Sequence, residues 1–161
     1  REIQVSDIMT PRVVMTTVDK GETVGEVIER IPIMIYGRMP MIGESMDEVR
    51  GMVLRSEILR KAAVDDYSSV MQDISREIFH CRQDDSVDKA LDVLLENKVQ
   101  MLIVKDEFGG TVGLITMEDV IETLLGVEIV DESDQEGIDD GVHHEDMREL
   151  AKRRYEDSGF E

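Results

Sequence analysis

The sequence lacks tryptophan, contains one cysteine, and only 4% of its residues are aromatic. The lone Cys81 cannot form a disulfide within the chain, which favours a reducing compartment. There is no run of about 18 apolar residues, so no segment is predicted to span a bilayer. Basic residues are also scarce, with 18 against 37 acidic ones and a net charge of −19. This balance argues against nucleic-acid binding, which needs a basic surface to displace counterions.

The chain does contain an internal repeat with an offset of about 62 to 66 residues. The segments that recur in the same order are Val5–Ile8 with Asp73–Ile74, Arg38–Ile42 with Gln100–Val104, and Gly51–Glu57 with Gly113–Asp119. A repeat of this length is one small supersecondary unit, and two copies bury their apolar faces together. The core they form is aliphatic and rich in methionine, of which the chain has eleven.

Each copy reads as a β-α-β-β-α unit, so the predicted fold class is α/β (α+β). In the first copy a short helical turn stops before Pro11, and the β-branched run at Val13–Thr17 predicts a strand. Thr23 and Glu26 form a capping box that opens a helix, which Pro32 ends. The later elements are strands at Arg38–Ile42 and Gly51–Leu54 and a helix at Ser56–Ala63.

The second copy repeats this order. The predicted elements are a strand at Ile78–Cys81, a helix capped by Ser86, strands at Gln100–Lys105 and Thr111–Ile115, and a helix from Thr116 to Gly126. The apolar positions expected to face the core are Val87, Leu91, Val93, Leu94 and Leu95 on the first helix, and Val120, Ile121, Leu124 and Leu125 on the second. Gly126 is the residue expected to end this last helix.

The final part of the chain is acidic, with 13 acidic and 4 basic residues from position 128 onward. Val127–Val142 is expected to be loosely ordered, and His144–Glu156 to form an amphipathic helix. The predicted organisation is therefore a first repeat at 1–64, a linker at 65–69, a second repeat at 70–127 and an acidic tail with a C-terminal amphipathic helix at 128–161.

Thr116 and Asp119 are the residues whose spacing points to chemistry. Thr116 follows a strand and occupies the N-cap of the next helix, where free backbone N–H groups face an anion. Asp119 lies one turn later on the same side, where a carboxylate can accept hydrogen bonds from two adjacent hydroxyls of a ribose. The pair suits a nucleoside phosphate. The alternative is that Thr116 only caps the helix and Asp119 only favours its dipole.

Other polar clusters give weaker indications. His143 and His144 are adjacent in an acidic loop and lack the spacing of a zinc site, so a helix start is preferred. Asp131–Asp140 lacks the spacing of a calcium loop. The sequence contains no nucleophile elbow, HExxH motif, CxxC pair or phosphate-binding P-loop. We therefore predict neither a catalytic site nor a metal site formed by protein ligands alone, and the chain is not expected to be an enzyme.

The chain resembles a cystathionine-β-synthase (CBS) domain pair, or Bateman module, and more narrowly the pair in the CNNM/CorC (hemolysin-like) family of membrane proteins associated with magnesium transport. The residues that carry the resemblance are Val5–Arg12, Tyr36–Pro40 and the long run Met101–Val120. Within that run, the turn Asp106–Gly110 leading into Gly113–Asp119 is the most specific segment. The resemblance covers roughly residues 4 to 132.

The resemblance implies two CBS repeats packed about a pseudo-twofold axis, with homodimerisation through the CBS pairs. It implies an adenine nucleotide, ATP or AMP with or without Mg²⁺, in the cleft of the second copy. The implied nucleotide-binding residues are Thr116, Asp119, Phe79, His80, Cys81, Thr10, Pro11, Arg38 and Met101. Arg38 would be the phosphate partner, the alternative being a surface arginine at the start of a strand, and Phe79 to Cys81 would line the adenine. Glu118 lies beside the pocket, where a solvated helix residue is preferred to a metal contact.

The first copy departs from this pattern, because Leu54 and Glu57 stand in place of the threonine and the aspartate. The first cleft is therefore not expected to bind a nucleotide through that motif. The chain begins at Arg1 rather than a methionine, and the resemblance implies a transmembrane domain upstream, with this part at the cytoplasmic face of the membrane. The expected function is a regulatory nucleotide-binding module. The competing hypothesis is a structural dimerisation module with degenerate, non-binding clefts.

Overall fold

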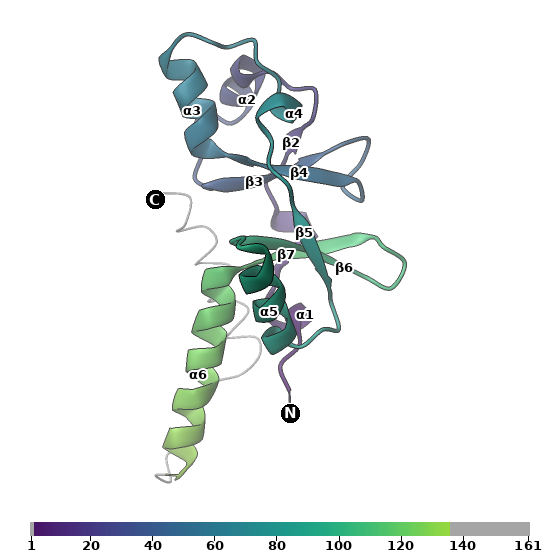
Figure 1. Ribbon diagram of the computed structural model, residues 1–161, viewed down its shortest axis with the longest axis vertical. Coiled ribbons are helices and arrows are strands. Elements are labelled where there is room, and N and C mark those ends of the chain that lie inside the picture. The colour runs from purple at the N-terminus through teal and green to yellow at the C-terminus, as the bar shows by residue number, and fades with distance from the viewer. Residues whose placement is uncertain (1, 136–161) are drawn as a thin grey trace. The chain divides into compact units, whose positions relative to one another are not determined.

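A computed structural model describes residues 2–135, with side-chain surroundings for residues 2–126. Within these residues the chain forms two compact units (Figure 1). We call residues 15–78 the first-repeat unit, and residues 2–14 together with 79–135 the second-repeat unit. The predicted C-terminal helix at His144–Glu156 lies outside the described residues. None of the helices in the described part is both long and apolar enough to cross a bilayer.

The first-repeat unit is a three-stranded sheet with helices on it. Strand β2 (Val18–Asp19) pairs in parallel with β3 (Arg38–Ile42), and β3 pairs antiparallel with β4 (Val49–Leu54). The helices are α2 (Val24–Arg30), α3 (Arg55–Ala63) and α4 (Met71–Ile74). The predicted capping box is confirmed, because the Glu26 amide donates to Thr23 Oγ1 and the Thr23 amide donates to Glu26 Oε1, both at 3.1 Å. The core consists of Val18, Val24, Val27, Met39, Met41, Val53, Ile58 and Met71.

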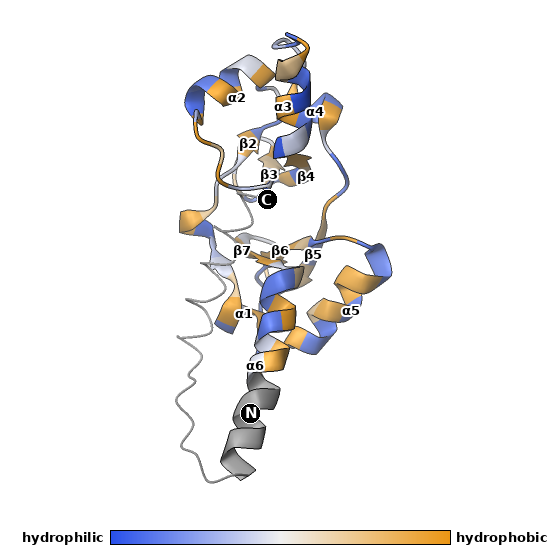
Figure 2. Ribbon diagram, turned by 90° about the vertical axis from the view of Figure 1, so that its left-hand side faces the viewer, coloured by the Kyte–Doolittle hydropathy of each residue, from blue (hydrophilic) through white to orange (hydrophobic). Residues whose placement is uncertain are grey.

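The second-repeat unit has a four-stranded sheet in the order β1-β7-β6-β5. Its strands are β1 (Thr10–Pro11), β5 (Phe79–Arg82), β6 (Met101–Lys105) and β7 (Thr111–Thr116). Its helices are α1 (Val5–Ile8), the 3₁₀ turn η1 (Arg12–Val14), α5 (Val87–Asn97) and α6 (Met117–Gln135). Both units thus contain the predicted β-α-β-β-α order, and the mixed α and β fold class is confirmed. Figure 2 shows hydrophobic and hydrophilic positions interleaved along α5, as expected for an amphipathic helix.

The units do not coincide with the sequence repeats, because each receives a short segment from the other half of the chain. Residues 2–14 precede the first repeat yet contribute α1, β1 and η1 to the second-repeat unit. In the same way α4 and Arg76 pack on the first-repeat unit, where Arg76 forms a bridge with Met52. The two repeats are therefore interlinked through their N-terminal segments.

The predicted strand at Val13–Thr17 is wrong. Residues 12–14 form η1 instead, and the strand of this region is the two-residue β2 at Val18–Asp19. Val13 is 89% exposed. A β-branched run becomes a strand only where a neighbouring strand and a half-buried surface are available. Here the chain leaves one unit for the other between residues 14 and 15.

The predicted end of the last helix is also wrong, because α6 continues through Gly126 to Gln135. Gly126 does not have the positive φ that a C′ glycine needs, whereas Gly109 does. The inward face of the helices is narrower than predicted. Val120 is fully buried, but Leu95, Ile121 and Leu125 are exposed. A helix with one packed side buries positions three and four apart, and these three residues lie one position beyond that stripe.

Candidate functional site

Thr116 and Asp119 cap the start of α6 reciprocally. Thr116 is the last residue of β7, and α6 begins at Met117. The Asp119 amide donates to Thr116 Oγ1 at 3.3 Å, and the Thr116 amide donates to Asp119 Oδ2 at 3.4 Å. Both hydrogen bonds are long, so each partner is held weakly. The arrangement places a hydroxyl, a carboxylate and a helix N-terminus together at one end of the sheet.

Asp119 is only 1% exposed, and its Oδ1 atom has no hydrogen-bond partner among the described residues. Burial raises the pKa of this carboxyl to about 7, against which the hydrogen bonds with Thr116 act, while nearby Glu118 and Glu122 raise it further. An unsatisfied buried acceptor costs about 1–3 kcal/mol. A helix cap does not require that cost, since a solvent-exposed aspartate caps equally well. The orphan oxygen is therefore open to a partner outside the described residues, either a water molecule or a ligand.

Thr10 provides a second orphan atom in the same unit. It is buried, and its Oγ1 has no partner within the described part of the chain. Thr10 pairs directly with Leu114 across β1 and β7. Opposed residues of an antiparallel pair share a face, and so do residues two apart along a strand. The Thr10 side chain consequently lies on the same face of the sheet as that of Thr116.

Met101 extends this row across the sheet. It is paired with Thr116 on β7, at the start of β6, next to the start of β5. His80 pairs with Ile103 and faces the same way as Met101, because Ile103 is two residues further along β6. The Met101 and His80 side chains are thus on the Thr116 face, in the region where the adenine was expected.

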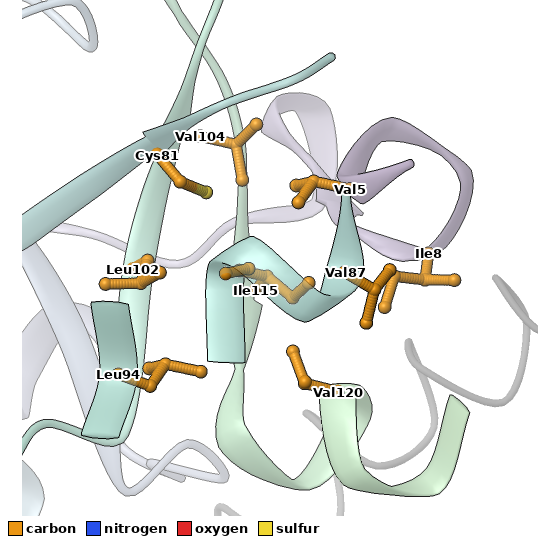
Figure 3. Close-up of a cluster of buried hydrophobic side chains, with 10 residues drawn as sticks. Val5, Ile8, Cys81, Val87, Leu94, Leu102, Val104, Ile115 and Val120 are labelled. Atoms are coloured by element: carbon orange, nitrogen blue, oxygen red, sulfur yellow. The ribbon is translucent and has the colours of Figure 1, made fainter. Parts of the chain in front are cut away.

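Phe79, Cys81 and Pro11 have the opposite orientation. Cys81 is in the hydrophobic cluster of this unit (Figure 3). Phe79 packs against that cluster, and Pro11 pairs with Gly113. Burial raises the pKa of the Cys81 thiol to about 12, so it stays protonated. These three residues can contribute backbone to a site on the Thr116 face, but their side chains lie on the opposite face of the sheet, where Cys81 and Phe79 contact the cluster that includes residues of α5 and α6.

Arg38 is the predicted residue that belongs to the other unit. It begins β3 and pairs with Leu54, so its register position in the first repeat corresponds to that of Met101 in the second. The other eight predicted residues all lie in the second-repeat unit.

In the first repeat, the Glu57 carboxylate accepts hydrogen bonds from arginines of the same unit. Leu54 is the N-cap of α3 and makes no side-chain cap hydrogen bond. Glu57 Oε1 instead accepts from Arg60 Nη1 at 2.9 Å and from Arg76 Nη2 at 3.5 Å. The position equivalent to Asp119 therefore has arginine partners within its own unit, whereas the Oδ1 atom of Asp119 is buried without a partner in the described residues.

Comparison with known proteins identifies the two repeats. The CBS domain model matches residues 5–64 and 68–126. The chain belongs to the CBS domain family. Among solved structures, it is 33% identical to the CBS domain of the bacterial CNNM/CorC family Mg²⁺ transporter in complex with ATP, with a TM-score of 0.71 over 76% of this chain and 87% of that one. A hemolysin-like CBS protein of Oenococcus oeni is 31% identical, with a TM-score of 0.69 over 75% and 89% of the two chains.

The curated relatives are longer proteins. The magnesium and cobalt efflux protein CorC of Vibrio cholerae is 32% identical over 96% of this chain and 50% of its own length. The protein of the same name from Escherichia coli K12 is 33% identical over 94% of this chain and 50% of its own length. The chain thus spans about half the length of the curated relatives it matches. The resemblance to the CNNM/CorC family inferred from the sequence is confirmed.

The second CBS domain also contains a residue whose role the sequence analysis did not anticipate. Gly113 lies in β7 beside β1, and a Cβ atom at this position would clash with the carbonyl oxygen of Thr10 and come within 2.9 Å of Met9 Sδ. A glycine within a strand pattern signals such a close approach, so the signal was present. Gly113 permits β1 to lie directly against the strand that ends at Thr116.

The first CBS domain contains a cavity of about 200 Å³ that is lined mostly by apolar side chains. Pro32 ends α2 at Arg30, whereas α5 continues for a further turn that includes the buried Leu94. The lining residues are Thr16, Ile31, Ile33, Met34, Ile35, Tyr36 and Met39. None of them is a cation, so the cavity does not suit a phosphate group.

Protein groups for a metal ion are not assembled in the CBS domains. Across residues 2–126, there is no cluster of three or more histidine, cysteine, aspartate or glutamate side chains that could hold one. Glu118 is exposed on the first turn of α6, next to Asp119. His143 and His144, which were considered for zinc, lie outside the described residues.

Proposed function

We propose that this chain is a regulatory module that binds an adenine nucleotide at the second CBS domain. The observation that carries the proposal is the buried Asp119, whose Oδ1 has no partner in the described structure, next to a helix N-terminus. The ATP complex of a CNNM/CorC CBS domain, 33% identical to this chain, supports the same ligand class.

In this proposal Asp119 accepts hydrogen bonds from the two ribose hydroxyls, because it is the acceptor with an unused oxygen. The Thr116 hydroxyl and the first-turn N–H groups of α6 face the phosphates, which the helix dipole favours. The Thr10 hydroxyl donates to the nucleotide from β1. Met101 and the start of β5 provide the surface for the adenine.

Mg²⁺ enters this proposal as a companion of the phosphates. It keeps several waters and binds through one or two carboxylates together with substrate phosphates. ATP is therefore expected to gain more from Mg²⁺ than AMP does.

We further propose that the module regulates a membrane protein of the CNNM/CorC type associated with magnesium transport. The relatives named as magnesium and cobalt efflux proteins support this context, and this chain covers half of their length. The module would lie at the cytoplasmic face, follow a transmembrane domain of the same polypeptide, and pair with a second copy. Nucleotide binding regulates transport only if it has different affinities for two arrangements of the protein.

Calorimetric titration with ATP and AMP, each with and without Mg²⁺, tests the binding proposal. We expect saturable heat with wild-type protein and a loss of roughly 10-fold or more in affinity for Asp119→Asn, consistent with 1.5–3 kcal/mol for a charged hydrogen bond. The matched control is Glu57→Gln in the first CBS domain, which should leave affinity unchanged. No heat and no shift of the melting temperature at millimolar nucleotide would refute the proposal.

The second candidate function is a structural dimerisation module whose clefts bind nothing. The observation that favours it is the first CBS domain, where Leu54 and the arginine-paired Glu57 leave no nucleotide motif. This reading predicts a stable dimer by analytical ultracentrifugation whose melting temperature does not respond to nucleotide. Slow ATP hydrolysis above background, which neither candidate predicts, would instead indicate an enzyme.

A further inference from the structure

The N-terminal segment is built into the unit that contains the candidate site. We call residues 3–14 the N-terminal strap. The Val5 amide donates to the Asp85 carbonyl at 2.9 Å, and the Ser6 amide donates to the Gln83 carbonyl at 3.0 Å. Val5 and Ile8 are fully buried in the cluster around Val87 and Ile115 (Figure 3). The strap is therefore docked by both backbone and side-chain contacts.

The strap approaches the candidate site most closely at β1. Gly113 allows the Thr10 carbonyl to lie where a side chain would otherwise stand. Beyond this contact, Arg12 Nη1 donates to the Thr111 carbonyl at 3.1 Å. Because β1 runs antiparallel to β7, the strap leads away from Thr116 after Thr10, so Thr10 is the residue of β1 nearest to that end of β7, and its buried, unpartnered hydroxyl lies on the Thr116 face.

We propose that the strap forms one wall of the nucleotide site, so that nucleotide occupancy and strap docking stabilise each other. The inference rests on the proposed nucleotide function. A ligand held by Asp119 on α6 and by Thr10 on the strap binds the docked form better than a form in which the strap is detached. Linkage is reciprocal, so docking raises nucleotide affinity by the same factor by which nucleotide favours docking.

The strap could also transmit nucleotide binding to the proposed transmembrane domain. It is the N-terminal end of the described chain, and the proposed transmembrane domain precedes it. A change in strap docking would therefore be transmitted along the polypeptide to that domain, without any contact between the nucleotide and the membrane part.

Hydrogen exchange of the strap amides measures its detachment directly. A ligand at 100 times its dissociation constant disfavours any state that cannot bind it by about 100-fold. We therefore expect exchange at Val5 and Ser6 to slow by up to about 100-fold with saturating Mg²⁺-ATP. At 10 times the dissociation constant, exchange at these amides should slow by about 10-fold.

The first-repeat unit provides an internal control. Arg76 crosses there in the same way, with its amide donating to the Met52 carbonyl at 2.7 Å, and a Cβ at Gly51 would lie 2.9 Å from the Arg76 carbonyl. This crossing adjoins Leu54 and Glu57, not a threonine and aspartate. Exchange at Arg76 should stay within about twofold on nucleotide addition.

Two variants test the reciprocal effect on affinity. Gly113→Ala displaces β1 and should weaken ATP binding at least 10-fold, whereas Gly51→Ala should not change it. Val5→Ala weakens the strap at a distance from the ligand and should lower affinity and speed exchange at Ser6. It keeps the test decisive if Gly113→Ala does not fold.

The outcomes separate the two proposals. If calorimetry shows ATP binding while exchange at Val5 and Ser6 is unchanged, the strap inference is wrong and the nucleotide function stands. Equal slowing at Arg76 and at the strap would also overturn it, because the ligand would then stabilise the whole fold. If ATP does not bind at all, the nucleotide function fails and the strap inference fails with it.

Discussion

Asp119 should make nucleotide affinity depend on pH near neutrality. Burial raises the pKa of its carboxyl from 3.8 to about 7, so the free protein at pH 6 carries mostly the protonated form. Only the carboxylate can accept from both ribose hydroxyls with all its lone pairs. With a pKa of about 7, the ionised fraction rises about 10-fold between pH 6 and pH 8, and affinity should rise by about the same factor.

The stability of the free protein should change in the opposite direction. Because the folded-state pKa is raised, the folded protein binds more protons than the unfolded chain between about pH 4 and pH 7. The contribution of this carboxyl to stability is therefore present below its unfolded pKa and is lost as pH rises through the folded value. Through this carboxyl, low pH therefore stabilises the nucleotide-free folded protein, whereas high pH favours the nucleotide-bound protein.

The assay is calorimetry with Mg²⁺-ATP at half-unit pH intervals from 6 to 8, together with thermal unfolding of the free protein. Phosphate groups titrate in the same range, so the Asp119→Asn variant serves as the reference for the ligand's own protonation. We expect the difference between the two proteins to follow one titration near pH 7. Parallel pH profiles for wild type and variant would show that Asp119 does not titrate in the site, and the reasoning from its burial would be refuted.

Three further predictions concern single side chains. Thr116→Ala removes both a helix cap and a ligand contact. It should lower the free energy of unfolding by about 1 kcal/mol in urea titration and weaken ATP binding by about 1–3 kcal/mol in calorimetry. Unchanged affinity would place the phosphates elsewhere. Leu94→Ala should cost about 2–5 kcal/mol in unfolding because Leu94 is fully buried, whereas Leu95→Ala should stay within about 0.5 kcal/mol, and similar losses would contradict the buried stripe described for α5. Glu57→Gln removes pairs with Arg60 and Arg76 that are partly exposed, so thermal melts should show a loss below about 1 kcal/mol, and a larger one would mean that the first CBS domain depends on these pairs.

Features that depend on neighbouring residues were predictable from the sequence. The caps at Thr23 and Ser86 are confirmed, with Ser86 Oγ accepting from the Lys89 amide at 3.1 Å, because a cap is made within one helical turn. The repeat predicted the β-α-β-β-α order, since both copies carry the same pattern. The hydrogen bonds between Thr116 and Asp119 likewise follow from their spacing of three residues.

Features that depend on distant residues were not predictable in the same way. Val13 has strand propensity but no neighbouring strand, and Gly126 is a helix breaker in isolation but lies inside α6. The orphan hydroxyl of Thr10 lies on β1, which pairs with β7 more than 100 positions away along the chain, and the burial of Asp119 likewise depends on tertiary packing. Side chains alternate between the two faces along β5, but the sequence alone could not show whether Cys81 or His80 faces Thr116. That depends on the register in which β5 pairs with β6.

The exchange of N-terminal segments sets the order in which the molecule can be completed during synthesis. Val5 and Ile8 are synthesised before the rest of the unit they belong to, and their partners Ile115 and Val120 are made more than 100 residues later. Contacts so far apart in sequence form slowly, and the apolar side chains of the early segment stay accessible to solvent in the meantime. A cut between the repeats would give two fragments, each still carrying the piece that its partner needs, so neither half is expected to fold alone.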